Sequence, residues 1–232
     1  MLQPEWQIDF PEYLERLHLT ERHFRKRLRL PMIGQVKKVL PLRELKEIHS
    51  VIPASQELLG YLIANIKTLS GELPFAKAKI EMLKLDPQQL RIGQKFAYRE
   101  NYVQLLEELS DIFRQKYAIN SGAANLGAFL IFGEDADGVS ALAYYLPPIV
   151  EQHKDELVIM DGIHRNYITL QVGTTITAIL VRNIQTPFPC SGHNWQEIRV
   201  ISLNEKPADI RDRYFDLHKE LFRDLKYLGI DG

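Results

Sequence analysis

Residues 156–168, which read ELVIMDGIHRNYI, decide the fold that we expect for this chain. Their four consecutive apolar residues, 157–160, predict a short strand that is covered on both faces. Gly162 lets the backbone turn sharply, and residues 163–172 follow a helical pattern. Residues 174–181 are rich in β-branched side chains and predict a second strand. The stretch therefore predicts a unit of strand, helix and strand.

The start of the predicted helix has the chemistry of a phosphate-binding corner. The first backbone N–H groups of a helix have no partners within it and carry the positive end of the helix dipole, so an anion is stabilised there. We expect the amides after Gly162, beginning with Ile163, to make this contact. His164 and Arg165 add cationic or donor side chains, and Asp161 can accept a hydrogen bond or bind a metal. The alternative is a structural turn whose charged side chains are only solvated.

Asp161 to Arg165 resemble the D-G-x-H-R motif of the ParB/sulfiredoxin-like superfamily. Its members include sulfiredoxins, free-serine kinases, CTP-binding ParB partition proteins and the DGQHR proteins of DNA modification systems. The resemblance covers residues 146–183 and extends back to residue 79, whereas residues 1–70 and 187–232 do not match. It implies a ParB/sulfiredoxin-like core that grips nucleotide phosphates at the start of a helix.

Differences between this chain and the family patterns limit which of the family's activities the resemblance implies. Sulfiredoxins are similar here but have Cys where this chain has Ile163, so sulfinic-acid repair is not expected. ParB proteins have a second motif of the E-N-x-x-R kind, and Gln104 stands where its Arg would follow Glu100 and Asn101. Free-serine kinases are most similar at D-G-x-H-R, but Ile163 replaces their second His.

The composition is that of an ordinary globular protein. Of the 232 residues, 45% are hydrophobic and 25% are charged, and the net charge is −1. This balance predicts no global attraction to nucleic acid or to an anionic membrane. A single cysteine excludes an internal disulfide, and no apolar run approaches the roughly 20 residues that cross a bilayer. The N-terminus has no signal-peptide pattern, so we expect a cytoplasmic protein without membrane contact.

The N-terminal third is expected to be mainly helical. Apolar spacing predicts four helices, over residues 9–18, 21–30, 41–50 and 55–69. A change of pattern near 70–76 separates a helical N-terminal extension, 1–75, from the core and its C-terminal helix, 76–232. The predicted fold class is α/β, with an α+β mixed sheet in the core.

The second predicted helix contains the main basic cluster of the chain. Arg25, Arg27 and Arg29 are its candidate nucleic-acid contacts, because clustered positive charge can neutralise phosphates. The apolar residues between them favour the alternative, which is a solvated helix face opposite a packed one.

Weaker patterns complete the expected order of elements. Outside the central unit they predict strands over residues 77–85, 128–132 and 197–203, and helices over 101–117, 139–145 and 207–225. Glu134, Asp135 and Asp137 could hold Mg²⁺, although a solvated turn is the simpler interpretation.

A loop at residues 187–195 supplies further candidates. Cys190 and His193 are three apart and could form a nucleophile with its base, although a free cysteine is usually inert. His193 and Trp195 are better candidates for lining the substrate side of a pocket.

The sequence thus favours a nucleotide-phosphate-binding protein, either a phosphotransferase or a hydrolase acting on a phosphorylated small molecule. ATP, ADP or CTP, with Mg²⁺, are the expected ligands. His164 and Asp161 would be catalytic, with Asp161 orienting His164 or acting as a base or metal ligand. The rival interpretation is a non-enzymatic module that binds nucleic acid or a protein, and self-association is left open. In a third interpretation the corner binds nothing.

Overall fold

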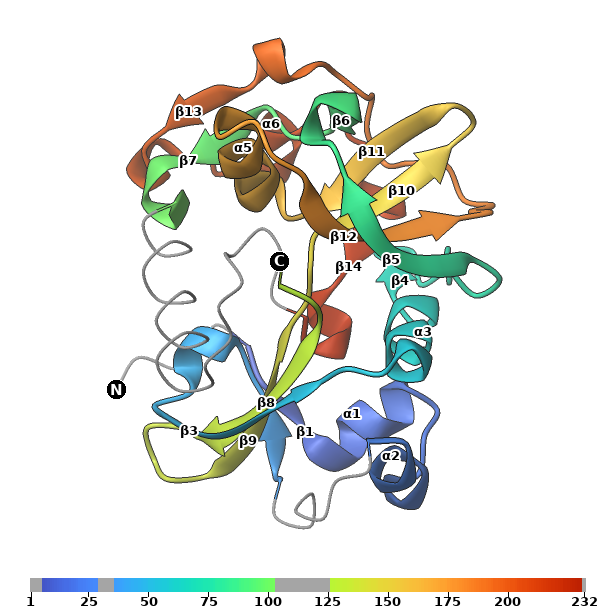
Figure 1. Ribbon diagram of the computed structural model, residues 1–232, viewed down its shortest axis with the longest axis vertical. Coiled ribbons are helices and arrows are strands. Elements are labelled where there is room, and N and C mark those ends of the chain that lie inside the picture. Colours follow the sequence, from blue (N-terminus) through green and yellow to red (C-terminus); the bar gives the residue numbers. More distant parts are fainter. Residues whose placement is uncertain (1–5, 29–35, 103–125, 231–232) are drawn as a thin grey trace. The chain divides into compact units, whose positions relative to one another are not determined.

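The computed structural model describes residues 6–28, 36–102 and 126–230, and the chain divides into two compact units (Figure 1). Unit 1 comprises Met1–Ala76, Gly127–Leu146 and Asp224–Gly232, and unit 2 comprises Lys77–Leu126 and Pro147–Arg223. The chain first passes between the units next to the boundary that the sequence suggested, and two later segments also belong to unit 1.

Unit 1 is built on a mixed sheet with the strand order β1-β2-β9-β8-β3. These strands are β1 (Ile8–Asp9), β2 (Lys38–Val39), β9 (Ser140–Tyr145), β8 (Phe129–Glu134) and β3 (Glu47–Pro53). β2 and β9 run parallel, and the other neighbours run antiparallel. The unit also contains α1 (Phe10–Arg16), α2 (Glu21–Leu28), α3 (Gln56–Ala64), the short strand β4 (Lys67–Thr68) and the 3₁₀ helix η2 (Leu42–Glu44).

Three of the four helices predicted for the N-terminal segment are confirmed as α1, α2 and α3. α1 and α3 are shorter than expected, and residues 29–30 of the second predicted helix lie outside the described residues. Ser55 caps α3 by accepting a hydrogen bond from the Leu58 amide at 3.1 Å. The helix predicted over 41–50 is wrong, because this segment forms η2 and then enters β3, which pairs with β8. The N-terminal segment is therefore mixed α and β, and not a purely helical extension.

The helix predicted over residues 139–145 is also wrong. This segment is β9, which has β2 on one side and β8 on the other. Its residues from Ala141 to Tyr145 are all buried. Alanine favours a helix in isolation, but pairing along both edges and burial on both faces decide for a strand here.

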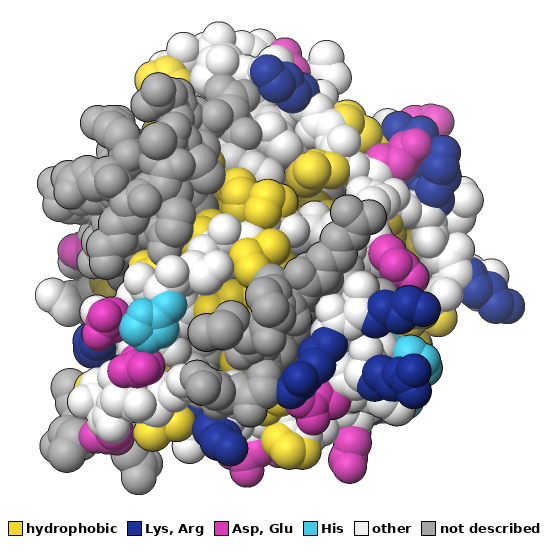
Figure 2. All heavy atoms as spheres, turned by 60° about the horizontal axis from the view of Figure 1, so that its bottom comes forward, with side chains coloured by type: hydrophobic (Ala, Val, Ile, Leu, Met, Phe, Trp, Pro, Cys, Tyr) yellow, Lys and Arg dark blue, Asp and Glu magenta, His cyan; other side chains and the backbone are white. Residues whose placement is uncertain are grey.

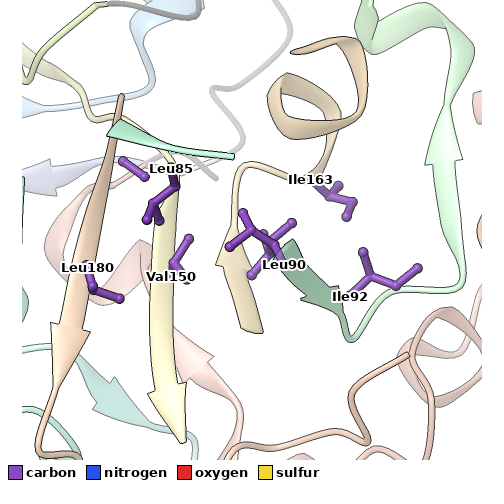
Figure 3. Packing of buried hydrophobic residues seen from close by; sticks show 8 residues of the cluster. Leu85, Leu90, Ile92, Val150, Ile163 and Leu180 are labelled. Carbon is purple, nitrogen blue, oxygen red and sulfur yellow. The ribbon is translucent and has the colours of Figure 1, made fainter. Parts of the chain in front are cut away.

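Unit 2 contains a second mixed sheet, with the order β5-β12-β10-β11-β6. These strands are β5 (Lys79–Leu85), β12 (Ile176–Arg182), β10 (Ile149–His153), β11 (Glu156–Asp161) and β6 (Leu90–Ile92). The strands predicted at 77–85 and before and after the motif are confirmed. The sheet carries a buried apolar cluster, of which Figure 3 labels Leu85, Leu90, Ile92, Val150, Ile163 and Leu180.

The predicted unit of strand, helix and strand is confirmed as β11, α5 (Ile163–Gln171) and β12. β10 and β11 form an antiparallel hairpin, and β12 pairs with β10 in parallel. β12 therefore runs opposite to β11, with β10 between them. α5 connects the end of β11 to the start of β12 at the same end of this sheet, and its first turn follows β11 directly (Figure 1).

The continuous C-terminal helix predicted from residue 207 to 225 is wrong. The segment forms α6 (Ile210–Arg213), the 3₁₀ helices η8 (Lys219–Leu221) and η9 (Lys226–Leu228), and the short strand β14 (Arg223–Asp224). Asp216 has a φ of 47°, which a right-handed helix does not allow. The Phe215 amide donates instead to the Gly93 carbonyl at 2.9 Å. A backbone hydrogen bond to the segment that follows β6 therefore replaces the hydrogen bonds that a continuous helix would form.

The remaining elements of unit 2 are small. β7 (Phe96–Tyr98) pairs in parallel with β13 (Arg199–Ile201), and η3 (Pro87–Gln89), η6 (Trp195–Glu197) and η7 (Leu203–Glu205) are 3₁₀ turns. The last predicted strand is confirmed as β13. The helix predicted over 101–117 lies outside the described residues except at its start. In the ranges that the structure describes, we find no helix with the length and apolar character needed to span a membrane.

Candidate functional site

The turn between β11 and α5 has a backbone that only glycine suits. Gly162 has φ 86° and ψ 32°, in the left-handed region, and it precedes the first residue of the helix. A Cβ at this position would also lie 2.8 Å from the Cβ of Pro148. The Asn166 amide donates to the Gly162 carbonyl at 3.1 Å, so the amides of Ile163 and His164 belong to the first turn and point out of the helix.

The side chain of Ile163 has a packing role. It is 5% exposed and lies in the apolar cluster of unit 2, among residues from β6 and the neighbouring strands (Figure 3). Burying an isoleucine in this way stabilises the fold by about 1.5–3 kcal/mol. The backbone N–H is therefore the group of Ile163 that could contact a ligand at this turn.

Asp161 is a buried carboxylate whose hydrogen bonding is incomplete. Its side chain is 9% exposed, and its Oδ2 atom lies 3.5 Å from Nη2 of Arg165. That distance makes an ion pair but not a hydrogen bond, and Oδ2 has no hydrogen-bond partner among the described residues. Burial raises the pKa of Asp161, opposed by the charge of Arg165 and by the Gly162 amide.

Arg165 lies one helical turn after Asp161, on the same side of the corner. Its side chain is 11% exposed, and the ion pair with Asp161 holds it at the beginning of α5. A guanidinium offers five donors in a fixed plane, which suits it to pairing with a carboxylate or a phosphate. The structure thus places the predicted phosphate ligand Arg165 beside the predicted acceptor Asp161.

His164 is oriented by β7 and not by Asp161. Its Nε2 atom accepts a hydrogen bond from the Tyr98 amide at 2.9 Å, and Asn101 Nδ2 lies 3.5 Å from the same atom. Burial, together with the charges of Arg165 and Lys206, lowers the pKa of His164 to about 4. The ring is therefore neutral at pH 7 and brings a hydrogen-bonding group, but no positive charge, to the corner.

The loop candidates occupy structural positions in unit 2. Burial raises the pKa of Cys190 to about 12, so its sulfur is a thiol and a weak nucleophile at neutral pH. His193 is stacked on Phe215 at 3.8 Å between ring centres, and its Nδ1 lies 2.7 Å from Glu197 Oε2.

Trp195 is a loop candidate that contacts α5. Its Nε1 donates to the Pro87 carbonyl at 2.7 Å, and its ring centre lies 6.1 Å from that of Tyr167 in α5. The indole also packs against the apolar cluster of unit 2. Trp195 thus supports the outer side of the helix whose first turn forms the corner.

The basic cluster of α2 is only partly described. Arg25 Nη2 lies 2.5 Å from Glu21 Oε1, one helical turn earlier. The side chain of Arg27, and Arg29 altogether, lie outside the described residues. On the face shown in Figure 2, Lys and Arg side chains are interspersed with Asp and Glu side chains, which weakens attraction for a polyanion.

The acidic turn after β8 is stabilised from within the protein. Asp135 forms an ion pair with Lys38 and accepts the amides of Asp137 and Val139, both at 2.9 Å. Its carboxylate therefore closes the turn between β8 and β9. Within residues 6–28, 36–102 and 126–230, no group of three or more His, Cys, Asp or Glu side chains is arranged to hold a metal ion.

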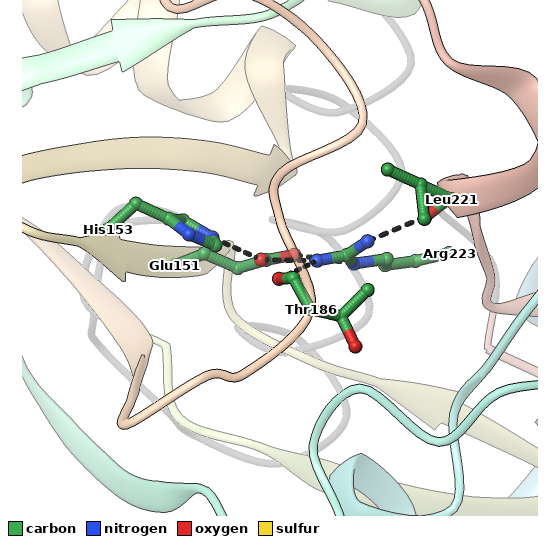
Figure 4. A network of polar contacts seen from close by, with 5 residues as sticks. All are labelled: Glu151, His153, Thr186, Leu221 and Arg223. Atoms are coloured by element: carbon green, nitrogen blue, oxygen red, sulfur yellow. Dashed lines mark hydrogen bonds and ion pairs between the residues drawn. The ribbon is translucent and has the colours of Figure 1, made fainter.

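The sequence interpretation missed a buried charge network in unit 2 (Figure 4). Arg223 donates to Glu151 through two bonds, of 3.0 and 2.9 Å, and to the carbonyls of Leu221 and Thr186. His153 Nε2 lies 2.7 Å from the same carboxylate. Glu151 and Arg223 are 0% and 1% exposed, and the pairing is bidentate. A glutamate directly after two apolar residues of β10 was the sequence signal for it.

Comparison of this chain with protein-family models, with curated proteins and with solved structures finds no match. The ParB/sulfiredoxin-like resemblance therefore rests on the motif and its setting of strand, turn and helix.

Proposed function

We propose that the start of α5 binds the phosphates of a nucleotide together with Mg²⁺. The observation that carries this proposal is the pairing of Asp161 and Arg165, in which a buried carboxylate oxygen has no hydrogen-bond partner among the described residues. An anion would be stabilised by the first-turn amides and Arg165, whereas a cation or a hydrogen-bond donor would be stabilised by Asp161 Oδ2. A magnesium–phosphate complex supplies both, because Mg²⁺ is commonly held by one or two carboxylates together with substrate phosphates.

Each residue of the corner has a distinct part in this proposal. The amides of Ile163 and His164 point at a phosphate oxygen, with the positive end of the helix dipole behind them. Arg165, which the ion pair with Asp161 holds at the corner, adds a positive charge beside the phosphate. Asp161 holds the metal, which when bound neutralises charge on the phosphates.

Phosphoryl transfer or phosphate hydrolysis is the reaction class that this arrangement favours. Such reactions depend mostly on positioning and on electrostatic stabilisation of phosphate oxygens, which the amides and Arg165 would provide. A non-enzymatic module that uses the same corner for a nucleotide or a nucleic-acid phosphate is the alternative. The two are separated by turnover, because only the enzyme releases inorganic phosphate or a phosphorylated product.

The proposal is tested by thermal melting of the full chain with ATP, ADP and CTP at millimolar concentration, with and without Mg²⁺. A ligand at about 100 times its dissociation constant stabilises the folded state by about 2.7 kcal/mol. We expect at least one nucleotide to raise the melting temperature, and Mg²⁺ to increase the shift. Arg165→Ala should abolish the shift.

The matched control is Arg211→Ala, which removes an exposed arginine from α6 in the same unit. It should respond to nucleotide as the wild-type protein does. The proposal is wrong if no nucleotide shifts the wild-type melting temperature, or if Arg165→Ala responds as fully as Arg211→Ala.

A further inference from the structure

The hydrogen bond between Tyr98 and His164 fixes the position of the proton on the imidazole ring. A backbone N–H can only donate, so the Nε2 atom at 2.9 Å from the Tyr98 amide must present its lone pair. A neutral imidazole carries its one proton on the other nitrogen. The ring is therefore the Nδ1–H tautomer.

Hydrogen-bond donors and positive charges beside His164 both oppose protonation of its ring. Asn101 Nδ2, a second donor, lies 3.5 Å from Nε2, and the rings of Tyr98 and Tyr102 lie against the imidazole at 5.8 and 5.6 Å between centres. The charges that act on it come from Arg165 and Lys206 and are both positive. In the part of the chain that the structure describes, the two donors at Nε2 and the two positive charges thus disfavour an imidazolium.

One nearby carboxylate is engaged elsewhere. Glu100 follows β7 closely along the chain, and it accepts hydrogen bonds from the Ser202 hydroxyl at 2.7 Å and the Leu203 amide at 2.8 Å. It therefore ties the β7 region to η7 and does not act as a counter-charge for His164.

We infer that His164 is a neutral specificity-determining residue, which donates a hydrogen bond through Nδ1–H to a ligand oxygen at the start of α5. Side chains of a helix lean toward its N-terminus, so a ring on the second helical residue lies over the first turn. This inference rests on the proposed function, and it assigns His164 to recognition and not to proton transfer. The Nδ1–H donor stays in place from pH 5.5 to 8, whereas a cationic histidine would lose its positive charge in that range.

The tautomer is tested by long-range ¹⁵N–¹H NMR of the imidazole in ¹⁵N-histidine-labelled full chain, without ligand. The signals of His164 are assigned by their loss in His164→Gln. We expect one protonated nitrogen, Nδ1, at pH 7, and no titration down to pH 5.5. An Nε2–H tautomer, or an imidazolium near pH 6.5, would overturn the inference whatever the ligand experiments give.

Two substitutions separate recognition from packing. In His164→Asn the side-chain amide stands near the Nδ1 position, so the donor is kept and the acceptor for the Tyr98 amide is lost. In His164→Gln an amide oxygen can reach the Nε2 position, so the acceptor is kept and the donor is lost. We therefore expect His164→Gln to melt at the higher temperature of the two and His164→Asn to bind magnesium–ADP more tightly.

One net hydrogen bond corresponds to about a 2- to 12-fold change in dissociation constant, which is the expected weakening in His164→Gln. A purely structural role predicts that affinity and melting temperature fall together in both variants, and that result overturns the inference. If the wild-type protein binds neither magnesium–ADP nor inorganic pyrophosphate, the proposed function fails, and the recognition role of His164 fails with it. In that case the NMR result still decides the tautomer, so the two failures are distinguishable.

Discussion

Two pairs of a carboxylate with an arginine in unit 2 differ in burial and in hydrogen bonding, although their carboxylates lie on the neighbouring strands β10 and β11. Glu151 and Arg223 are fully buried and joined by two hydrogen bonds, and further acceptors complete the guanidinium. Asp161 and Arg165 are 9% and 11% exposed and lie 3.5 Å apart, and one buried carboxylate oxygen has no hydrogen-bond partner in the part of the chain that the structure describes.

The comparison distinguishes a charged pair that stabilises the fold from a charged pair that has groups available to a ligand at Asp161. Buried polar atoms are almost always hydrogen-bonded, because an unsatisfied one costs about 1–3 kcal/mol. The pair of Glu151 and Arg223 obeys this rule and has no capacity left for a ligand. The pair of Asp161 and Arg165 departs from it at the first turn of a helix, where an anion is stabilised.

Glu151→Gln should be the most damaging change. The substitution keeps the size of the side chain but leaves the buried Arg223 without a counter-charge, which costs about 3–5 kcal/mol of folding free energy. Urea unfolding, followed by Trp195 fluorescence in a Trp6→Phe background, measures the loss in unit 2.

Asp161→Asn is the matched change in the other pair, and its expected effect at pH 7 is under about 1 kcal/mol. Burial raises the pKa of Asp161 above its usual 3.8. The contribution of this side chain to the free energy of unfolding is therefore fully present below pH 3.8, where the carboxyl is protonated, and is lost as the pH rises through the folded pKa. Removing the carboxylate at pH 7 therefore takes little from stability. Equal losses in Glu151→Gln and Asp161→Asn would remove the distinction between the pairs.

Gly162→Ala sharpens the comparison by testing how firmly the backbone of the corner is held. The left-handed φ alone costs about 1–2 kcal/mol with a Cβ present, and the contact with Pro148 adds to it. Gly173→Ala, at the other end of α5, is the control, because it has a φ of 65° but no atom within 4 Å of a new Cβ. Equal destabilisation of the two variants in urea would show that the packing against Pro148 is unimportant.

Local pattern was enough to predict the centre of unit 2. The apolar run before Asp161, Gly162 in its turn, and the β-branched run after α5 all have the structures that their sequence predicts. In each case the deciding interactions lie within a few residues, namely backbone conformation, capping and burial of one continuous run.

Interactions between distant residues explain what could not be predicted. β9 is a strand because β2 and β8 flank it, and the C-terminal segment turns at Asp216 instead of continuing as a helix. At the candidate site, the residues Asp161 to Arg165 were found from the motif, but the partner of His164 lies 66 positions away, in Tyr98. A sequence pattern cannot supply such a contact, and this contact decides the charge of the imidazole.

The most direct measurement of the central claim is a titration of the ¹⁵N-labelled full chain with magnesium–ADP, followed by amide NMR. The account predicts that the largest shifts fall on the amides of Ile163 and His164, and that Arg165→Ala abolishes them. Shifts that centre on another part of the chain, or no shift at millimolar nucleotide, would contradict it.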